Sequence, residues 1–192
     1  MLRLPRVIFL AGKKGVGKSF ICELLKARAG YSVLHIAAPW LEKWWADRGY
    51  DFWTVTPETK ATWREAIQRD AAEAREKDPD VLVKMLDDRI RDYAGDGLVV
   101  DGVRFHNEAL YGISQGYFVA KVDTPDAVRR RRFIERGENL SLLDDPFERE
   151  LGEDFPCHVI LPGDRGADFY IPAISAAYVR LKEAGRRMRE AA

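Results

Sequence analysis

A glycine-rich octapeptide near the start of the chain has the residue types and spacing of a phosphate-binding loop. Residues 12–19 read Gly-Lys-Lys-Gly-Val-Gly-Lys-Ser, which fits the pattern G-x-x-x-x-G-K-S/T. Glycines let backbone N–H groups converge on phosphate oxygens, and a following helix adds the partial positive charge of its N-terminus. The pattern predicts that Lys18 reaches the β- and γ-phosphates of ATP and that the Ser19 hydroxyl binds Mg²⁺. Contacts with ATP are expected from Gly12, Lys14, Gly15, Val16, Gly17, Lys18, Ser19 and Phe20.

An aspartate that ends a second apolar run is the candidate metal carboxylate. Asp101 follows Leu98-Val99-Val100 directly. A carboxylate at the end of a buried strand can hold Mg²⁺ directly or through water. Capping of the next turn, or a position facing the acceptor, are the alternatives for Asp101. We therefore expect Ser19 and Asp101 to bind the metal, with Lys18 and Asp101 in catalytic roles.

Strands and helices alternate along the chain around these residues. Val7–Ala11 is a continuous apolar run, typical of a strand buried on both faces of a parallel sheet. A helical period follows Ser19 and predicts a helix with Gly30 at its C-terminal cap. Further strands are expected at 32–37, 98–100, 117–122 and 157–161, and helices at 107–114, 126–136 and 170–191. The alternation predicts a single α/β domain over residues 1–192, with a parallel sheet of about five strands flanked by helices.

Residues 39–93 interrupt the alternation with a mostly helical stretch, interpreted as an insert on the acceptor side. Thr56 and Asp80 are expected to cap two of its helices. Arg64 and Gln68 lie one helical turn apart and are candidates for binding the acceptor's phosphate and base. An exposed polar face is the alternative for this pair.

The tryptophans of this stretch lie between Trp40 and Trp63. Large aromatic side chains usually pack in cores, so helix packing is expected for most of them. Stacking on an acceptor base is the alternative for one. His35, just before the stretch, is expected to be a packed, neutral core histidine.

A cluster of arginines marks a candidate lid at about residues 126–154. Five arginines fall between Arg129 and Arg136 on a strongly helical segment. Lid arginines close over phosphates and exclude water, and Arg132 is our catalytic candidate, with Arg129 and Arg136 as alternatives. A solvated face paired with the acidic residues 138–154 is the competing interpretation. That acidic segment holds few apolar anchors and is expected to be a mobile surface segment.

Composition excludes several classes of protein. Lys plus Arg and Asp plus Glu each number 31, so the formal net charge is zero and a wholly basic nucleic-acid-binding surface is disfavoured. Two cysteines cannot form a disulfide scaffold or a four-thiolate zinc site. The apolar runs are far shorter than the ~20 residues that span a bilayer. We expect a cytoplasmic protein, in a host cytoplasm if the source is a phage, with no membrane partner; a homodimer stays open.

Several segments together resemble the phage-type deoxynucleoside monophosphate kinases, over about residues 5–165. Val99–Ala109, Val-Val-Asp-Gly-Val-Arg-Phe-His-Asn-Glu-Ala, resembles that family's D-V-R-F-x-N-E-A segment. Ile36–Pro39 resembles its F-A-D-P, and Asp78–Val83 its P-D-x-W-V. Residues 148–150 and 157–160 resemble its late acidic segment and last strand.

The resemblance implies the fold of P-loop nucleotide kinases and transfer of the ATP γ-phosphoryl group to a nucleoside monophosphate, with ATP and Mg²⁺ as cofactors. Arg104 matches the family's arginine and becomes a candidate clamp on the acceptor phosphate, because a guanidinium fork suits bidentate binding; a structural salt bridge is the alternative. Asn107 and Glu108 follow as acceptor candidates or helix caps. Ala38 stands where the family has Asp, which favours a phosphate acceptor that needs little general-base help.

Two other functions stay open. A kinase of the same fold could phosphorylate a hydroxyl on DNA, such as that of 5-hydroxymethyluracil, with Asp101 or His35 as base. A non-catalytic nucleotide-binding module would bind ATP without transferring its phosphoryl group. The combination of Lys18, Ser19 and Asp101 favours an enzyme over the module.

Overall fold

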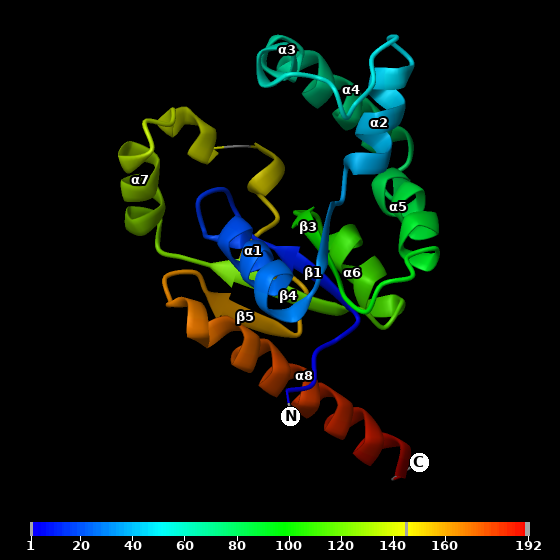
Figure 1. Cartoon of the computed structure of the whole chain (residues 1–192), viewed down its shortest axis with the longest axis vertical. Coiled ribbons are helices and arrows are strands. Elements are labelled where there is room, and N and C mark those ends of the chain that lie inside the picture. The colour runs from blue at the N-terminus through cyan, green and yellow to red at the C-terminus, as the bar shows by residue number, and fades with distance from the viewer. Residues whose placement is uncertain (1, 145, 191–192) are drawn as a thin grey trace. The chain divides into compact units, whose positions relative to one another are not determined.

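Five strands form one sheet with β1 (Val7–Ala11) at its centre, in the order β2-β3-β1-β4-β5 (Figure 1). β1 runs parallel to β3 on one side and to β4 on the other, and β4 runs parallel to β5. This confirms the predicted sheet. The other strands are β2 (Ser32–His35), β3 (Leu98–Val103), β4 (Phe118–Asp123) and β5 (Val159–Pro162).

The computed structural model describes residues 2–144 and 146–190. The chain divides into two units, one made of residues 1–34 with 95–192 and one of residues 35–94. The sheet core and the phosphate loop belong to the larger unit. The helices of the larger unit are α1 (Lys18–Ala29), α6 (His106–Ser114), α7 (Asp126–Glu135) and α8 (Ala167–Glu190).

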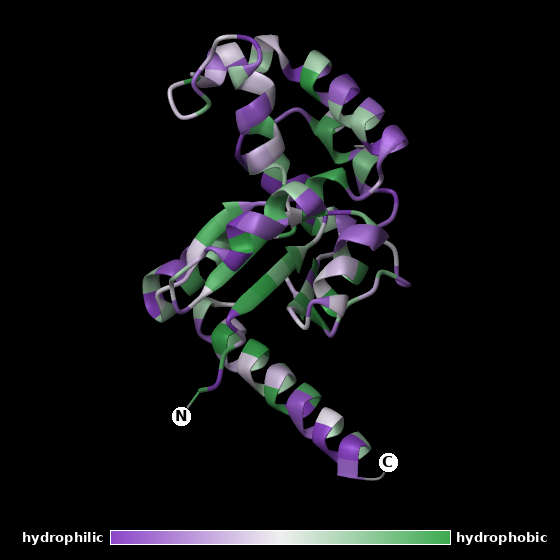
Figure 2. Cartoon of the chain, turned by 90° about the vertical axis from the view of Figure 1, so that its right-hand side faces the viewer, coloured by the Kyte–Doolittle hydropathy of each residue, from purple (hydrophilic) through white to green (hydrophobic). Residues whose placement is uncertain are grey.

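Helices cover both faces of the sheet, which explains why β1 is apolar without alternation. Ile8 and Leu10 join the core formed with α1 and α8, including Leu25 and Ile174. Phe9 points to the opposite face, where its ring lies against Gly112 of α6. The strands accordingly stand out as hydrophobic in Figure 2. As predicted, Gly30 ends α1 in the left-handed conformation, with φ of 71°.

The acidic segment at residues 138–154 is anchored more firmly than predicted, and its mobility remains a prediction. The segment forms two short 3-10 helices, Leu140–Asp144 and Pro146–Glu148. Leu143, Leu151 and, just beyond, Phe155 are buried. These anchors lie eight and four residues apart. The average composition of the segment is acidic, so it does not reveal this spacing.

The smaller unit is helical and packs around tryptophans. Its helices are α2 (Ala38–Ala46), α3 (Pro57–Thr62), α4 (Arg64–Lys77) and α5 (Val81–Arg91). Trp44 and Trp45 are buried, and both rings contact Trp63 edge-on. This confirms helix packing as the main role of these tryptophans.

One of the two predicted caps in this unit is present. The Thr56 side chain accepts a hydrogen bond from the Thr59 N–H at 3.3 Å and caps α3. Asp80 precedes α5, but its side chain makes no capping bond. Instead Asp78 accepts from the Asp80 N–H at 3.1 Å and binds Lys84 at 2.9 Å. The prediction for Asp80 was wrong because the earlier aspartate already binds the turn.

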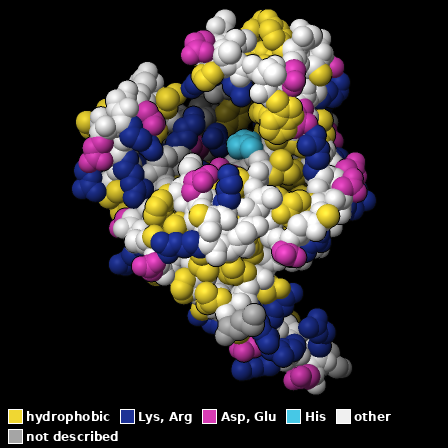
Figure 3. Space-filling view, viewed as in Figure 1, with side chains coloured by type: hydrophobic (Ala, Val, Ile, Leu, Met, Phe, Trp, Pro, Cys, Tyr) yellow, Lys and Arg dark blue, Asp and Glu magenta, His cyan; other side chains and the backbone are white. Residues whose placement is uncertain are grey.

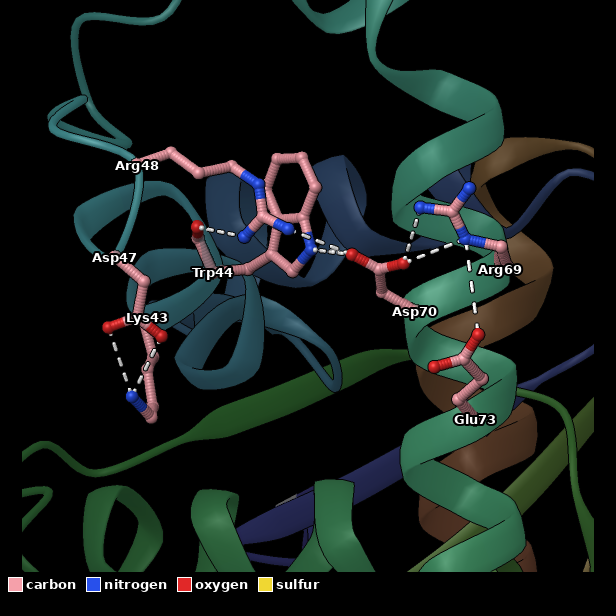
Figure 4. Close-up of polar contacts among 7 residues, drawn as sticks. All are labelled: Lys43, Trp44, Asp47, Arg48, Arg69, Asp70 and Glu73. Carbon is pink, nitrogen blue, oxygen red and sulfur yellow. Dashed lines mark hydrogen bonds and ion pairs between the residues drawn. The ribbon is translucent and has the colours of Figure 1, made fainter.

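Asp70 of α4 ties this helix to α2 through a polar network (Figure 4). Its Oδ2 accepts from the Trp44 indole N–H and from the Arg48 guanidinium, both at 2.9 Å. The Arg48 guanidinium also lies 3.6 Å from the centre of the Trp44 ring. The network therefore joins a buried aromatic, a carboxylate and a cation across two helices.

α8 is the longest helix, at 24 residues. Its first half packs on the sheet, and Lys and Arg side chains gather on its last turns (Figure 3). Among the described residues, no helix is both long and apolar enough to cross a membrane.

Candidate active site

The phosphate loop connects β1 to α1, the structural context that its pattern requires. Gly17 immediately precedes α1 with φ of 109°, so Lys18 and Ser19 open the helix. Gly12 has φ of 145°, and a Cβ placed there would lie 2.5 Å from the carbonyl oxygen of Val122 on β4. The loop therefore needs glycine here both for its backbone conformation and for its close approach to the neighbouring strand.

Lys18 lies over the loop's own backbone. Its Nζ donates hydrogen bonds to the carbonyl oxygens of Gly12, at 2.6 Å, and Lys13, at 3.1 Å. Burial lowers the pKa of Lys18, the negative charges of Asp101 and Glu148 raise it, and the positive charge of Arg104 lowers it. The charges of Asp101, Glu148 and Arg104 therefore all act on the Lys18 ammonium.

Asp101 lies inside β3 rather than at its end, which corrects the predicted strand boundary. β3 continues to Val103 because Gly102, with φ of 88°, lets the chain bulge and then resume pairing with β1. The Asp101 carboxylate is half-buried, and one oxygen accepts from the Gly102 N–H at 2.7 Å. The negative charge of Asp101 acts on Lys18, and the metal role of Asp101 remains a prediction.

The residues expected to hold Mg²⁺ suit that ion. Ser19 is exposed in the first turn of α1 and offers a hydroxyl oxygen, while Asp101 offers a carboxylate oxygen. Mg²⁺ prefers oxygen ligands and is commonly held by one or two protein groups together with substrate phosphates. The described residues contain no cluster of three or more His, Cys, Asp or Glu side chains that could hold a metal ion.

The acceptor candidates on α6 differ in what they do. Glu108 is 1% exposed, and its Oε2 accepts from the backbone N–H groups of Arg104, at 2.8 Å, and Phe105, at 3.2 Å. It therefore orients the start of α6, the capping alternative. Asn107 is half-buried in the first turn of the helix. Arg104 is half-buried, and its charge acts on Lys18.

The other two acceptor candidates belong to the smaller unit. Arg64 and Gln68 lie on α4, one turn apart, and both are exposed. Their spacing is as expected, but Lys18, Asp101 and Arg104 belong to the larger unit. A role of Arg64 and Gln68 toward the acceptor remains a prediction.

Two of the arginines on α7 bind carbonyl oxygens of the phosphate loop. Arg132 donates to Gly15, at 3.0 Å, and to Gly163 in the turn after β5, at 2.9 Å. Arg129 is buried and donates from Nε to Lys14 at 2.8 Å. Arg136 pairs instead with Glu138 at 2.9 Å. In this structure Arg132 thus holds the loop's backbone, and a catalytic contact of Arg132 with ATP remains a prediction.

Glu148 is a residue of the site that its sequence context did not predict. Its side chain is 3% exposed, and its Oε1 accepts from the backbone N–H of Lys14 at 2.6 Å. Its other oxygen pairs with Arg129 at 3.3 Å. The available signal was the spacing of Leu143 and Leu151 around it, which marks the segment as packed.

His35 corrects another prediction. It is exposed at the end of β2 rather than packed in the core, and its Nδ1 accepts from the Ala37 N–H at 3.2 Å. β2 is one of the two edge strands of the sheet and is largely exposed, so its residues do not share the burial of β1.

The segment that carries the site also identifies the family. Residues 8–155 match the AAA domain family, a span that contains the phosphate loop, Asp101 and α7. The chain belongs to this family. No curated protein matches the AAA domain protein described here.

Two solved structures that are similar to this chain are kinases by name. A gluconokinase from Sinorhizobium meliloti 1021 has a TM-score of 0.52 and 18% identity, covering 97% of this chain and 98% of the other. A shikimate kinase from Bacteroides thetaiotaomicron has a TM-score of 0.52 and 16% identity, covering 94% and 98%. The fold of this AAA domain protein is that of P-loop kinases. The finer resemblance to phage-type deoxynucleoside monophosphate kinases remains a prediction.

Proposed function

We propose that this AAA domain protein transfers the γ-phosphoryl group of ATP to a (deoxy)nucleoside monophosphate, giving the diphosphate, with Mg²⁺ as cofactor. The observation that carries the proposal is the position of Lys18. It opens α1 at the end of the phosphate loop and is close enough to Asp101 and Arg104 for their charges to act on it. Phosphoryl transfer needs such positioning and charge neutralisation more than covalent chemistry.

Each residue of the site has a role in this proposal. The loop's backbone N–H groups and the N-terminus of α1 bind the β- and γ-phosphates. Lys18 exchanges its bonds to the Gly12 and Lys13 carbonyls for phosphate oxygens and follows the migrating group. Ser19 and Asp101 hold Mg²⁺, which neutralises phosphate charge when bound.

The choice of a monophosphate acceptor rests on Arg104 and Ala38. The positive charge of Arg104 acts on Lys18 and lowers its pKa, and a guanidinium fork suits a terminal phosphate. Ala38 has no carboxylate, so it cannot act as a general base toward an alcohol acceptor. An acceptor phosphate is already anionic and needs little general-base help.

A hydroxyl on DNA, such as that of 5-hydroxymethyluracil, is the second candidate acceptor, and a specific observation favours it. The half-buried Asp101 carboxylate has the chemistry to accept a hydroxyl proton. In addition, Trp53 of the smaller unit is 74% exposed, and an exposed indole is a stacking surface for an unpaired base.

Acceptor identity is tested with a panel of substrates under one condition. The protein is incubated with γ-labelled ATP, Mg²⁺ and, separately, each deoxynucleoside monophosphate, each ribonucleoside monophosphate, ordinary DNA and DNA containing hydroxymethyluracil. We expect labelled diphosphate from one or a few monophosphates. Label on DNA alone would replace the leading proposal by the second, and ATP binding without transfer to any acceptor would leave a nucleotide-binding module.

A further inference from the structure

Two side chains from outside the phosphate loop form hydrogen bonds with the peptide groups on either side of Lys14. On one side, Glu148 accepts a hydrogen bond from the Lys14 N–H at 2.6 Å. On the other, Arg129 donates from Nε to the Lys14 carbonyl oxygen at 2.8 Å. Arg129 lies 115 positions and Glu148 lies 134 positions from Lys14 in sequence, so both hydrogen bonds form only in the folded protein.

Glu148 and Arg129 also bind each other. Their charged groups lie 3.3 Å apart, and the side chains are 3% and 4% exposed, respectively. Arg129 uses its remaining nitrogen to bind Asp126 at 2.7 Å. Every nitrogen of the guanidinium therefore has a partner, which a buried ion pair needs in order to offset its desolvation.

The segment that carries Glu148 is itself fixed to the larger unit at alternate residues. Glu150 accepts from the His106 N–H at 2.6 Å, at the start of α6. The Gly152 carbonyl accepts from the buried Lys121 of β4, also at 2.6 Å. Residues 148–152 are thus bonded to α7, to the start of α6 and to β4, and Glu148 in turn bonds to the phosphate loop.

We propose that the buried Arg129–Glu148 pair is a positioning device that fixes the phosphate loop for the nucleotide's phosphates, an inference that rests on the proposed ATP binding. Neither residue needs to touch the reacting atoms. A loop with several glycines loses much conformational freedom when it binds phosphate, and a loop already held loses less. Because Arg129 neutralises Glu148, the carboxylate can hold the loop without repelling ATP.

The test measures ATP affinity directly, by calorimetry without acceptor. Arg129→Met and Glu148→Gln are each expected to weaken ATP binding at least tenfold. Arg129→Lys keeps the charge but cannot bind Lys14, Asp126 and Glu148 together, so it is expected to weaken binding as well. The double variant is expected to be little worse than either single variant, because the two residues act as a unit.

Arg130 supplies the matched control. It is an exposed arginine on the same helix, and Arg130→Met is expected to bind ATP as the wild type does. Thermal unfolding of every variant is measured in parallel, and affinities are compared well below the lowest midpoint. If Arg129→Met does not fold, the ATP affinities of Glu148→Gln and Arg129→Lys test the inference instead.

An unchanged ATP affinity in folded Glu148→Gln and Arg129→Lys would overturn the inference, because the pair would then serve stability alone. A pair with a purely structural role lowers the unfolding midpoint without changing the affinity of the folded protein. This outcome is distinct from failure of the proposed function, in which the wild type binds ATP but phosphorylates no acceptor.

Discussion

Lys18 is the side chain on which the proposed chemistry depends most directly. Its ammonium is bound to the carbonyls of Gly12 and Lys13, and burial lowers its pKa. Asp101 and Glu148 act in the opposite direction and favour the charged form. The site thus offers one cation that phosphate oxygens can take over from backbone carbonyls.

Lys18→Ala is expected to reduce turnover at least about 100-fold, since one charge that stabilises the transferring phosphoryl group is lost. The protein is expected to stay folded, because Lys18 binds only exchangeable carbonyl groups. Steady-state kinetics and circular dichroism check this pair of expectations. A near-normal rate would refute the assignment of the loop.

Arg104 is predicted to act on the acceptor rather than on ATP. Arg104→Ala is expected to raise KM for the acceptor roughly 10- to 100-fold, the range for a lost charge-assisted hydrogen bond. ATP affinity is expected to change little. Separate titrations of the two substrates measure this, and the reverse pattern would move Arg104 to the donor side.

At the scale of elements, the phosphate loop is packed against β4 as well as joined to β1. Gly12→Ala would place a Cβ 2.5 Å from the Val122 carbonyl at φ of 145°. We expect it to destabilise the fold by at least about 2 kcal/mol and to weaken ATP binding. Gly166→Ala is the control, because a Cβ there meets no atom within 4 Å. Denaturant unfolding of both variants gives the comparison, and equal stabilities would contradict this packing.

The network around Asp70 predicts a pH dependence in the smaller unit. The hydrogen bond from the Trp44 indole, opposed by desolvation and aided by Arg69, lowers the pKa of Asp70 below its ordinary 3.8. A lowered folded-state pKa means that the carboxylate stabilises the fold above pH 3.8, and that this stability is lost as the pH falls through the folded-state pKa.

Asp70→Asn is therefore expected to be less stable than the wild type at neutral pH, with the difference shrinking as the solution is acidified. Tryptophan fluorescence during urea unfolding follows it, because Trp44 is the partner of Asp70. Glu73→Gln on the same helix is the control, since Glu73 is 57% exposed and 4.0 Å from Arg69. A stability difference that does not vary with pH would contradict the role given to the carboxylate.

The elements that could be predicted from sequence are those specified by local patterns. The apolar run of β1, the loop pattern and Gly30 each fix a conformation by residue type. The bulge at Gly102 and the contact of Glu148 with Lys14 could not be predicted, because both depend on pairing with residues distant in sequence. The spacing of Leu143 and Leu151 indicates only that the segment around Glu148 is packed. His35 was misplaced for the same reason, since burial depends on the strand's position in the sheet.

The whole molecule has the fold of P-loop kinases, and Lys18, Asp101 and Arg104 belong to its larger unit. Lys18 follows β1, whereas Asp101 and Arg104 lie in and directly after β3, and the pairing of β1 with β3 brings these two segments together. Because β3, β1 and β4 run parallel, their carboxyl ends lie at the same end of the sheet. The site is therefore a property of the topology and of the loop pattern together.

The proposal that the site around Lys18 phosphorylates a nucleoside monophosphate is tested most directly by an assay of phosphoryl transfer. The assay supplies γ-labelled ATP, Mg²⁺ and a pool of deoxynucleoside monophosphates, and it compares the wild type with Lys18→Ala. We expect labelled diphosphate and stoichiometric ADP from the wild type, and loss of both in the variant. Labelled diphosphate formed equally by Lys18→Ala, or ATP bound by the wild type with no label transferred, would contradict it.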